Sequence, residues 1–127
     1  MLTSVTEEIR NILHVCCRAM ILPLRDEVLR LQGYQVVSTL STQEAVSIAR
    51  ERDFSLVLVD VEGEGRVPQA EELCSDIRAL RPKQKVAFVC NHRVHIHSDC
   101  PDEVLRAQFN PQELVRGVKQ LLEPDPK

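Results

Sequence analysis

Asp60 is the residue whose type and position in this sequence most directly suggest chemistry. It ends the apolar run 54–60 and is followed at once by a polar, glycine-containing stretch. In open α/β sheets, reactive side chains gather at the carboxyl ends of the strands. Cys16 and Cys17 follow another apolar run, and Cys90 ends a third. We therefore expect one carboxylate and three thiols at the same edge of a sheet.

The elements that would position these residues are short strands alternating with amphipathic helices. The first four strands are apolar enough to be buried on both faces, which is typical of a parallel sheet. Strict alternation of this kind favours a doubly wound, five-stranded α/β fold, a three-layer α/β/α sandwich. The strands are predicted at residues 11–16, 35–40, 54–60, 85–90 and 103–108.

The helices are predicted from apolar residues that recur at helical spacing. Leu24, Val28 and Leu31 share one helical face, which we expect to turn toward the core before the helix ends at Gly33. Pro23 fits the first turn of that helix. The core-facing positions of the later helices are Ala45, Ile48, Ala49, Leu73, Cys74, Ile77, Leu80, Leu114, Val118, Leu121 and Leu122, and the N-caps are Ser41 and Asn110.

The length of 127 residues predicts one domain, with an N-terminal arm at 1–9, a core at 10–122 and a loose tail at 123–127. The net charge of −3, with both signs interspersed, argues against nucleic-acid binding. No apolar run is long enough to cross a membrane, so we expect a cytoplasmic protein without membrane contact. Five cysteines is an odd number, and their core-like surroundings predict reduced thiols without a disulfide.

The order of these segments resembles the receiver domain of response regulators over residues 10–122. The resemblance implies the strand order 2-1-3-4-5, flavodoxin-like, with Asp60 as the phospho-accepting aspartate. It rests on the segments Ile12-Leu13-His14-Val15 with two residues after it, Gly33-Tyr34-Gln35-Val36, Glu44-Ala45, Leu56-Val57-Leu58-Val59-Asp60, Val86-Ala87-Phe88-Val89-Cys90 and Phe109-Asn110-Pro111-Gln112-Glu113-Leu114.

The chain departs from the family at the residues that support phosphoryl transfer. The resemblance places Cys16 and Cys17 at the acidic-pair positions, Cys90 at the hydroxyl position and Ala107 at the lysine position. Mg²⁺ prefers hard oxygen ligands, so we expect its binding to be weak or absent and predict no cofactor. Arg106 is a poor substitute for the lysine, because its side chain points to the opposite face of the strand.

The segment 91–101 is expected to change the surface that partners read in this family. It alternates apolar and polar residues and contains Pro101, so the fourth helix is predicted to be shortened or absent. In an extended segment, His95 and His97 lie on one side. Together with Cys90 and Cys100 they are candidate ligands for a metal that prefers nitrogen and sulfur. The simpler interpretation is a solvated loop.

Simpler interpretations exist for the strand residues as well. Asp60 can be a solvated carboxylate that starts a loop, and His14 is expected to be a satisfied core histidine. Cys16 and Cys90 are interpreted as small apolar residues that fill space in the core. Their strands would stand roughly 9.6 Å apart, beyond the reach of a disulfide, about 7 Å.

The sequence thus predicts a stand-alone, receiver-like signalling module of the phosphorelay or two-component type. It is expected to be degenerate, to be no enzyme, and to act through protein contacts rather than efficient phosphorylation of Asp60. The expected partner is a sensor kinase or another signalling protein, and a homodimer is left open. The alternative function is a thiol- or metal-responsive sensor on the same fold.

Overall fold

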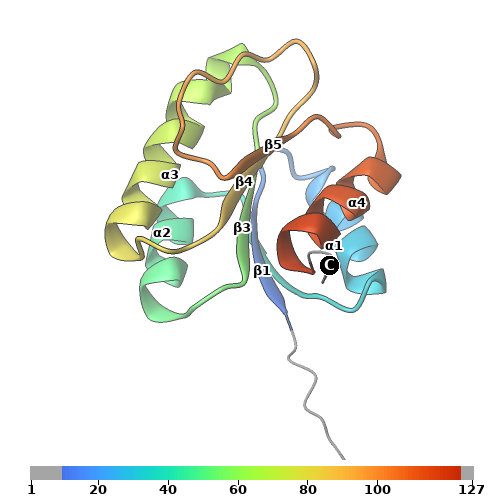
Figure 1. Ribbon diagram of the computed structural model, residues 1–127, viewed down its shortest axis with the longest axis horizontal. Helices are drawn as coiled ribbons and strands as arrows, with labels where there is room; N and C mark the ends of the chain where they lie inside the picture. Colours follow the sequence, from blue (N-terminus) through green and yellow to red (C-terminus); the bar gives the residue numbers. More distant parts are fainter. Residues whose placement is uncertain (1–9, 124–127) are drawn as a thin grey trace, which may run out of the picture.

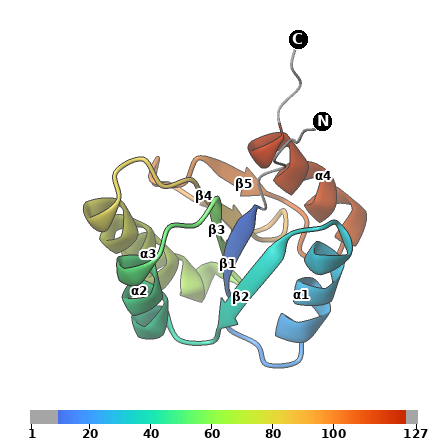
Figure 2. The same cartoon turned by 90° about the horizontal axis from the view of Figure 1, so that it is seen from below.

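The computed structural model describes residues 10–123, which fold into a parallel sheet flanked by helices (Figure 1), and the five strands follow the order β2-β1-β3-β4-β5 (Figure 2). The predicted arm and most of the predicted tail lie outside this range. The strands are β1 (Asn11–Val15), β2 (Gln35–Thr39), β3 (Leu56–Asp60), β4 (Val86–Val89) and β5 (Glu103–Leu105). The helices are α1 (Leu22–Leu31), α2 (Thr42–Glu51), the short 3₁₀ helix η1 (Glu64–Arg66), α3 (Val67–Leu80) and α4 (Pro111–Leu122). The predicted fold and strand order are confirmed, although β5 is shorter than expected.

The helices cover the sheet in two layers (Figure 2). On one face, α2 and α3 bury a cluster that includes Val57, Val59 and Phe88. On the other face, α1 and α4 cover Leu56 and Leu58. The sheet is buried on both faces, as its near-continuous apolar strands require. Among helices of the described residues, none combines the length and apolar character that a membrane span needs.

Local sequence signals position most helix ends as predicted. Gly33 follows α1 with a φ of +95°, which a side-chain-bearing residue rarely adopts. Ser41 accepts a hydrogen bond from the backbone N–H of Glu44, and Asn110 caps α4 in the same way. Pro23 lies in the first turn of α1.

The prediction for the buried face of α1 was wrong. Leu24 and Leu31 are 64% and 73% exposed, whereas Arg25, Asp26 and Leu29 are buried. The helix is therefore turned so that a charged pair faces the molecule and an apolar stripe faces outward. The cost of burying these charges is offset by partners on other elements, described below.

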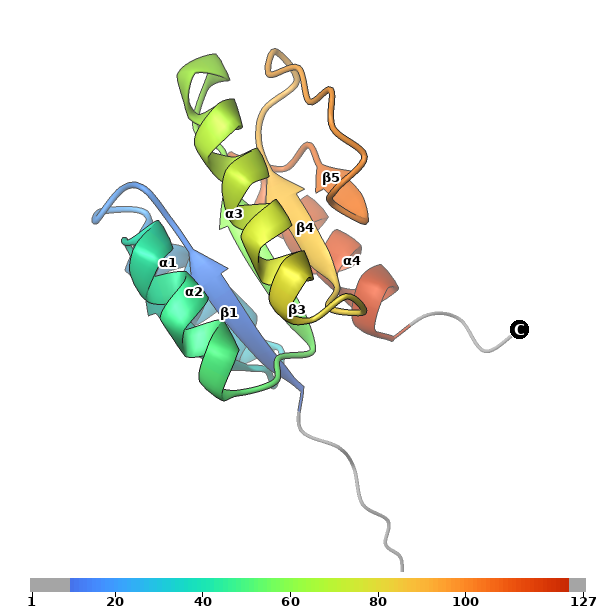
Figure 3. The same ribbon diagram turned by 90° about the vertical axis from the view of Figure 1, so that its left-hand side faces the viewer.

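The segment between β4 and β5 contains no helix, as predicted, and runs as a loop beside α3 (Figure 3). Val94 in this loop is 2% exposed and packs into the α2/α3 cluster. The prediction that all cysteines are free was wrong, because Cys74 of α3 and Cys100 of the loop form a disulfide with a Cα–Cα distance of 6.3 Å. Our geometric argument considered cysteines at the strand ends, and this pair joins a helix to a loop.

Candidate functional site

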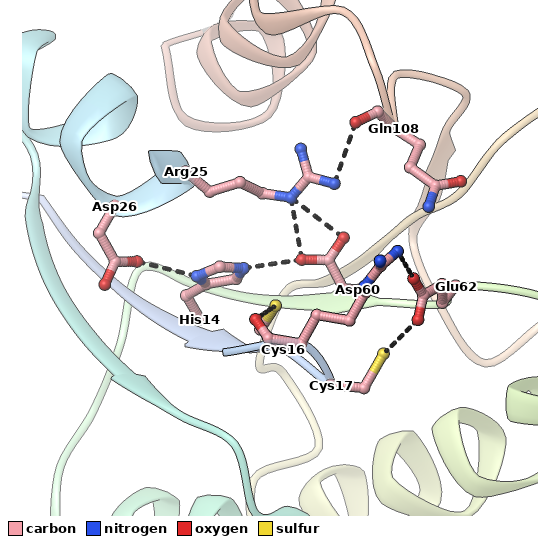
Figure 4. Close-up of polar contacts among 9 residues, drawn as sticks. His14, Cys16, Cys17, Arg25, Asp26, Asp60, Glu62 and Gln108 are labelled. Atoms are coloured by element: carbon pink, nitrogen blue, oxygen red, sulfur yellow. Dashed lines mark hydrogen bonds and ion pairs between the residues drawn. The ribbon is translucent and has the colours of Figure 1, made fainter. Parts of the chain in front are cut away.

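Four charged side chains form a continuous network at the edge of the sheet (Figure 4). His14 Nδ1 lies 2.8 Å from Asp26 Oδ1, and His14 Nε2 lies 2.9 Å from Asp60 Oδ2. Arg25 Nε donates to both oxygens of Asp60, at 3.1 and 2.9 Å. The four side chains are between 0% and 9% exposed. We call these residues the Asp60 network.

The hydrogen-bond geometry requires His14 to be protonated. Each of its ring nitrogens faces a carboxylate oxygen, and an ionised carboxylate only accepts hydrogen bonds. A neutral imidazole has a single N–H and would leave one nitrogen lone pair against an acceptor. Burial alone would lower the pKa of His14, but the hydrogen bonds to Asp26 and Asp60 outweigh it and raise the pKa to about 10. His14 is therefore an imidazolium at neutral pH.

The two carboxylates stay ionised for the same reason. Burial would raise the pKa of Asp60, but the hydrogen bond from His14 and the charge of Arg25 lower it overall. Burial also opposes ionisation of Asp26, whose pKa is nevertheless lowered by hydrogen bonds from His14 and Ser38. Two anions thus alternate with two cations, and the network carries no net charge. This balance is what makes its burial tolerable.

Strand register and the first turns of α1 bring the network together. His14 of β1 pairs with Leu58 of β3, and Asp60 lies two residues further along, so both side chains are on the same face of the sheet. That face is covered by α1, which presents Arg25 and Asp26. Arg25 also donates through Nη2 to the carbonyl of Gln108 at 3.1 Å. One guanidinium therefore joins α1, β3 and the loop after β5.

The strand-end thiols lie beside the network, and Cys16 is close enough to His14 to help raise its pKa. Cys16 is buried and donates to the carbonyl of Arg18 at 3.4 Å. Cys17 lies 3.5 Å from Glu62 Oε1, and burial together with this carboxylate raises the pKa of Cys17 to about 11. Burial also raises the pKa of Cys90, although Arg106 opposes the shift. The raised pKa values favour the protonated thiol of Cys17 and of Cys90 at neutral pH.

Two hollows border Asp60, and the larger, of about 110 Å³, is lined by Leu40 and Arg66 among others. A cavity of about 20 Å³, lined by Cys16, Cys17, Arg25 and Asp60 among others, has room for about one water molecule. His14, Cys16 and Asp60 offer ligand atoms within 4.8 Å of one another, the only such group in the part of the chain that the structure describes. A metal there would have to displace the proton of His14 and compete with Arg25 for Asp60.

Solved structures identify the architecture. The response regulator TrrA of Thermotoga maritima, solved with Mg²⁺-BeF, is 27% identical, with 90% of this chain and 100% of TrrA covered and a TM-score of 0.75. TrrA in complex with the histidine kinase ThkA gives 26% identity, 91% and 100% coverage and a TM-score of 0.77. A receiver domain from Methanospirillum hungatei gives 22% identity, 91% and 95% coverage and a TM-score of 0.75. The chain has the fold of a response-regulator receiver domain. No protein-family model and no curated protein sequence matches it.

The strand-end residues can be compared with the positions that the receiver family uses. Cys16 and Cys17 line the cavity beside Asp60, where the resemblance to receivers places an acidic pair. Ala107 is 2% exposed at the position that the resemblance assigns to the lysine. Mg²⁺, which the family implies, does not fit this donor set, because thiols are poor ligands for it and Arg25 already holds both oxygens of Asp60. Arg25, from α1, supplies the cation that the strand-end position lacks.

The second set of predicted ligands is not brought together. Cys100 is bonded to Cys74, and Cys90 is buried with Arg106 Nη1 at 3.4 Å from its sulfur. The rings of His95 and His97 stack with centroids 6.3 Å apart on the exposed loop, where His95 Nδ1 lies 3.0 Å from Glu64. The hypothesis of a His/Cys metal site there was wrong.

Sequence reasoning missed Arg25 and Asp26 as members of the site. It placed His14 correctly as a satisfied core histidine but did not connect it to Asp60. The alternative that Asp60 is a solvated carboxylate does not hold, since its side chain is 6% exposed. The available signal was His14 itself, because a histidine in a buried strand needs partners for two ring nitrogens.

Proposed function

We propose that this chain is a degenerate receiver of two-component signalling, which acts through protein contacts and not by accepting a phosphoryl group on Asp60. The likeness to receiver domains supports the coarser assignment to two-component signalling. One observation supports the proposal that Asp60 does not accept a phosphoryl group. Both oxygens of Asp60 are already engaged by cations of the protein itself.

This arrangement removes what phosphoryl transfer needs. The attacking carboxylate oxygen must reach phosphorus in line, while a metal and a lysine neutralise the phosphoryl oxygens. Here His14 and Arg25 bind the oxygens of the carboxylate itself. The cavity of about 20 Å³ lined by Arg25 has no room for a phosphoryl group, so it could approach only through the hollow of about 110 Å³ that Asp60 shares with Leu40 and Arg66. Asp60 is therefore a structural anion that fixes α1 to the sheet.

The geometry also supports a non-catalytic role. Cys16, His14 and Asp26 have the residue types of a nucleophile, a base and an orienting carboxylate. However, His14 Nε2 is bonded to Asp60, and all three residues are at most 3% exposed. A protonated imidazole cannot take the thiol proton, and no substrate reaches it.

Without phosphoryl transfer or catalysis, the chain would act by binding a protein partner. The histidine kinase ThkA binds the receiver TrrA, which has the same fold as this chain. The outward stripe of α1 provides a surface for such a contact, because Leu24 and Leu31 are 64% and 73% exposed, and Met20, in the turn before the helix, is 79% exposed. We assign a sensor kinase or a similar signalling protein as the partner, with a second copy of the chain as the alternative occupant.

The test is mass spectrometry after incubation with acetyl phosphate and Mg²⁺. We expect native protein and Asp60→Asn to give the same spectrum, without a phosphoryl adduct. A rapidly formed adduct that is absent from Asp60→Asn would overturn the proposal.

A gain-of-function variant makes a negative result informative. Cys16→Asp, Cys17→Asp, Cys90→Thr and Ala107→Lys, combined with Arg25→Ala, restore the receiver residues and free Asp60 Oδ1, while His14 keeps its contact with Oδ2. We expect this variant, if folded by circular dichroism, to bind Mg²⁺ and to form the adduct. A folded variant that neither binds Mg²⁺ nor forms the adduct would show that the resemblance assigns the receiver positions to the wrong residues.

A further inference from the structure

The loop between β4 and β5 is held firmly at its start. Arg106 Nη1 donates to the carbonyls of Asn91 at 2.8 Å and Val94 at 2.5 Å. The backbone N–H of His95 donates to Glu64 Oε2 at 2.7 Å, and the side chain of Val94 is buried. Residues 91–95 therefore have several independent attachments to the rest of the protein.

The chain is held firmly again at Asp102. Its backbone N–H donates to the carbonyl of Val86 at 2.8 Å, and its carboxylate accepts from the N–H of Val86 at 2.8 Å. Arg78 of α3 donates to the same carboxylate at 2.7 Å. These contacts fix the start of β5 without any help from the loop.

Between these two anchors, residues 96–101 depend on the disulfide. Ile96 is only partly buried, and the backbone N–H of Ser98 donates to Glu71 of α3 at 3.2 Å. The backbone N–H of Cys100 is satisfied within the loop, by Ser98 Oγ at 2.9 Å. The Cys74–Cys100 bond is the strongest link between this stretch and α3.

We propose that the Cys74–Cys100 disulfide is a redox latch that holds residues 96–101 on α3. Cys74 is fully buried, whereas Cys100 is partly exposed, so a dithiol reductant reaches the sulfur of Cys100. A thiolate of the reductant attacks Cys100 Sγ and forms a mixed disulfide with it, and Cys74 leaves as a thiolate that takes up a proton. The second thiol of the reductant then attacks the reductant's own sulfur in this mixed disulfide, and Cys100 leaves as a thiol. Two electrons pass to the protein, and the reductant becomes a disulfide.

The other thiols are unsuited to competing for this bond. Cys16 and Cys90 are buried at the ends of β1 and β4. The raised pKa values of Cys17 and Cys90 keep them protonated at neutral pH. Opening and closing of the latch therefore involves one pair of cysteines, and not a reshuffling among five.

Opening the latch changes an apolar surface. Ile96, Cys100 and Val104 pack against the α2/α3 cluster from its edge. Release of 96–101 lifts the first two away and uncovers Val104 together with the adjoining side of α3. The protein thus has two surfaces at this edge, selected by its redox state. This inference is independent of the role of Asp60.

Hydrogen exchange of the oxidised and dithiothreitol-reduced protein tests the latch, read by mass spectrometry. We expect exchange in peptides covering 96–101 to accelerate by more than about tenfold on reduction, while 91–95 and β4 stay unchanged. Thermolysin, which cleaves before large apolar residues, should cut at Ile96 faster in the reduced protein. Equal exchange and equal cleavage in the two states would overturn the proposal.

Cys100→Ser is the matched variant, since its position is partly exposed and the change is small. It should exchange like the reduced native protein and show no further response to dithiothreitol. A response in this variant would place the redox effect elsewhere and overturn the proposal. Thiol titration of denatured, unreduced native protein should give three thiols of the five cysteines; five would mean that the latch does not form.

Discussion

The two faces of the sheet are held by different means. On the α2/α3 face the buried side chains are apolar, and the loop that completes the layer is tied down by a disulfide. On the α1/α4 face an equally apolar layer gives way, at the carboxyl edge of the strands, to four buried charges. One face is held mainly by apolar contacts, and the other depends also on buried charges that must be paired.

This difference shows how a receiver fold can hold the aspartate at the end of β3 with cations of its own. An aspartate at the end of β3 is costly to bury alone, and the receiver family balances it with a metal and a lysine. Here His14 and Arg25 supply the positive charge from β1 and α1. The carboxylate therefore stays ionised although it is buried.

Removing Arg25 is the strongest test of the claim that the α1/α4 face depends on paired charges. Arg25→Met leaves two carboxylates against one imidazolium, so the buried network acquires a net negative charge. We expect the free energy of unfolding to fall by roughly 3–5 kcal/mol, the usual cost of leaving one buried charge uncompensated. Urea denaturation measures it. Arg50→Met, at an exposed position of α2, is the control and should change stability by less than about 0.5 kcal/mol.

A double variant separates charge from packing. Arg25→Met with Asp60→Asn keeps Asp26 and His14 as a neutral pair, and the asparagine side chain introduced by the second substitution still accepts a hydrogen bond from His14. We expect the double variant to be more stable than Arg25→Met alone, with a coupling of at least about 1 kcal/mol. Losses that simply add would mean that the network does not act as a unit.

The same contrast marks what the sequence can predict. Gly33, Ser41 and Asn110 act on neighbouring backbone, so their roles are visible locally and were predicted correctly. Apolar strands predicted the sheet, because burial on both faces leaves a continuous apolar run. The buried side of α1 was predicted wrongly, because Arg25 finds its partner in Asp60, 35 residues away.

The disulfide escaped prediction for a similar reason. Cys74 and Cys100 are 26 residues apart, in a helix and in a loop, and their spacing matches no recognisable motif. The pairing depends on how the loop folds back on α3, which the sequence pattern does not encode locally. Non-local pairing of polar or sulfur-bearing residues is thus the part of this structure that periodicity cannot supply.

The pH dependence of stability sharpens the comparison further. The pKa of His14 is raised from 6.5 to about 10, so its contribution is complete below pH 6.5 and is lost as the pH rises toward 10. We expect the free energy of unfolding to fall across this window, by at most about 1.4 kcal/mol per pH unit. Asp26 and Asp60 have lowered pKa values, so their contribution is lost only in acid, below about pH 4.

His14→Gln provides the reference for this measurement. Glutamine does not titrate, so the difference between native protein and variant isolates the histidine from lysines and tyrosine. The difference should shrink steadily between pH 6.5 and about 10. A difference independent of pH would mean that His14 is neutral in the folded protein, against the geometry of its two carboxylate partners.

The smallest expected effect concerns the outward stripe of α1. Leu24→Ser and Leu31→Ser should each change the free energy of unfolding by less than about 0.5 kcal/mol, because both side chains are mostly exposed. Leu29→Ala, on the buried side, should cost about 2–5 kcal/mol. Residues 24 and 31 lie on the exposed side of the helix, away from Arg25 and Leu29, so the contrast reports its rotation directly. A loss at Leu24 as large as that at Leu29 would mean that α1 is turned the other way, and then Arg25 could not reach Asp60.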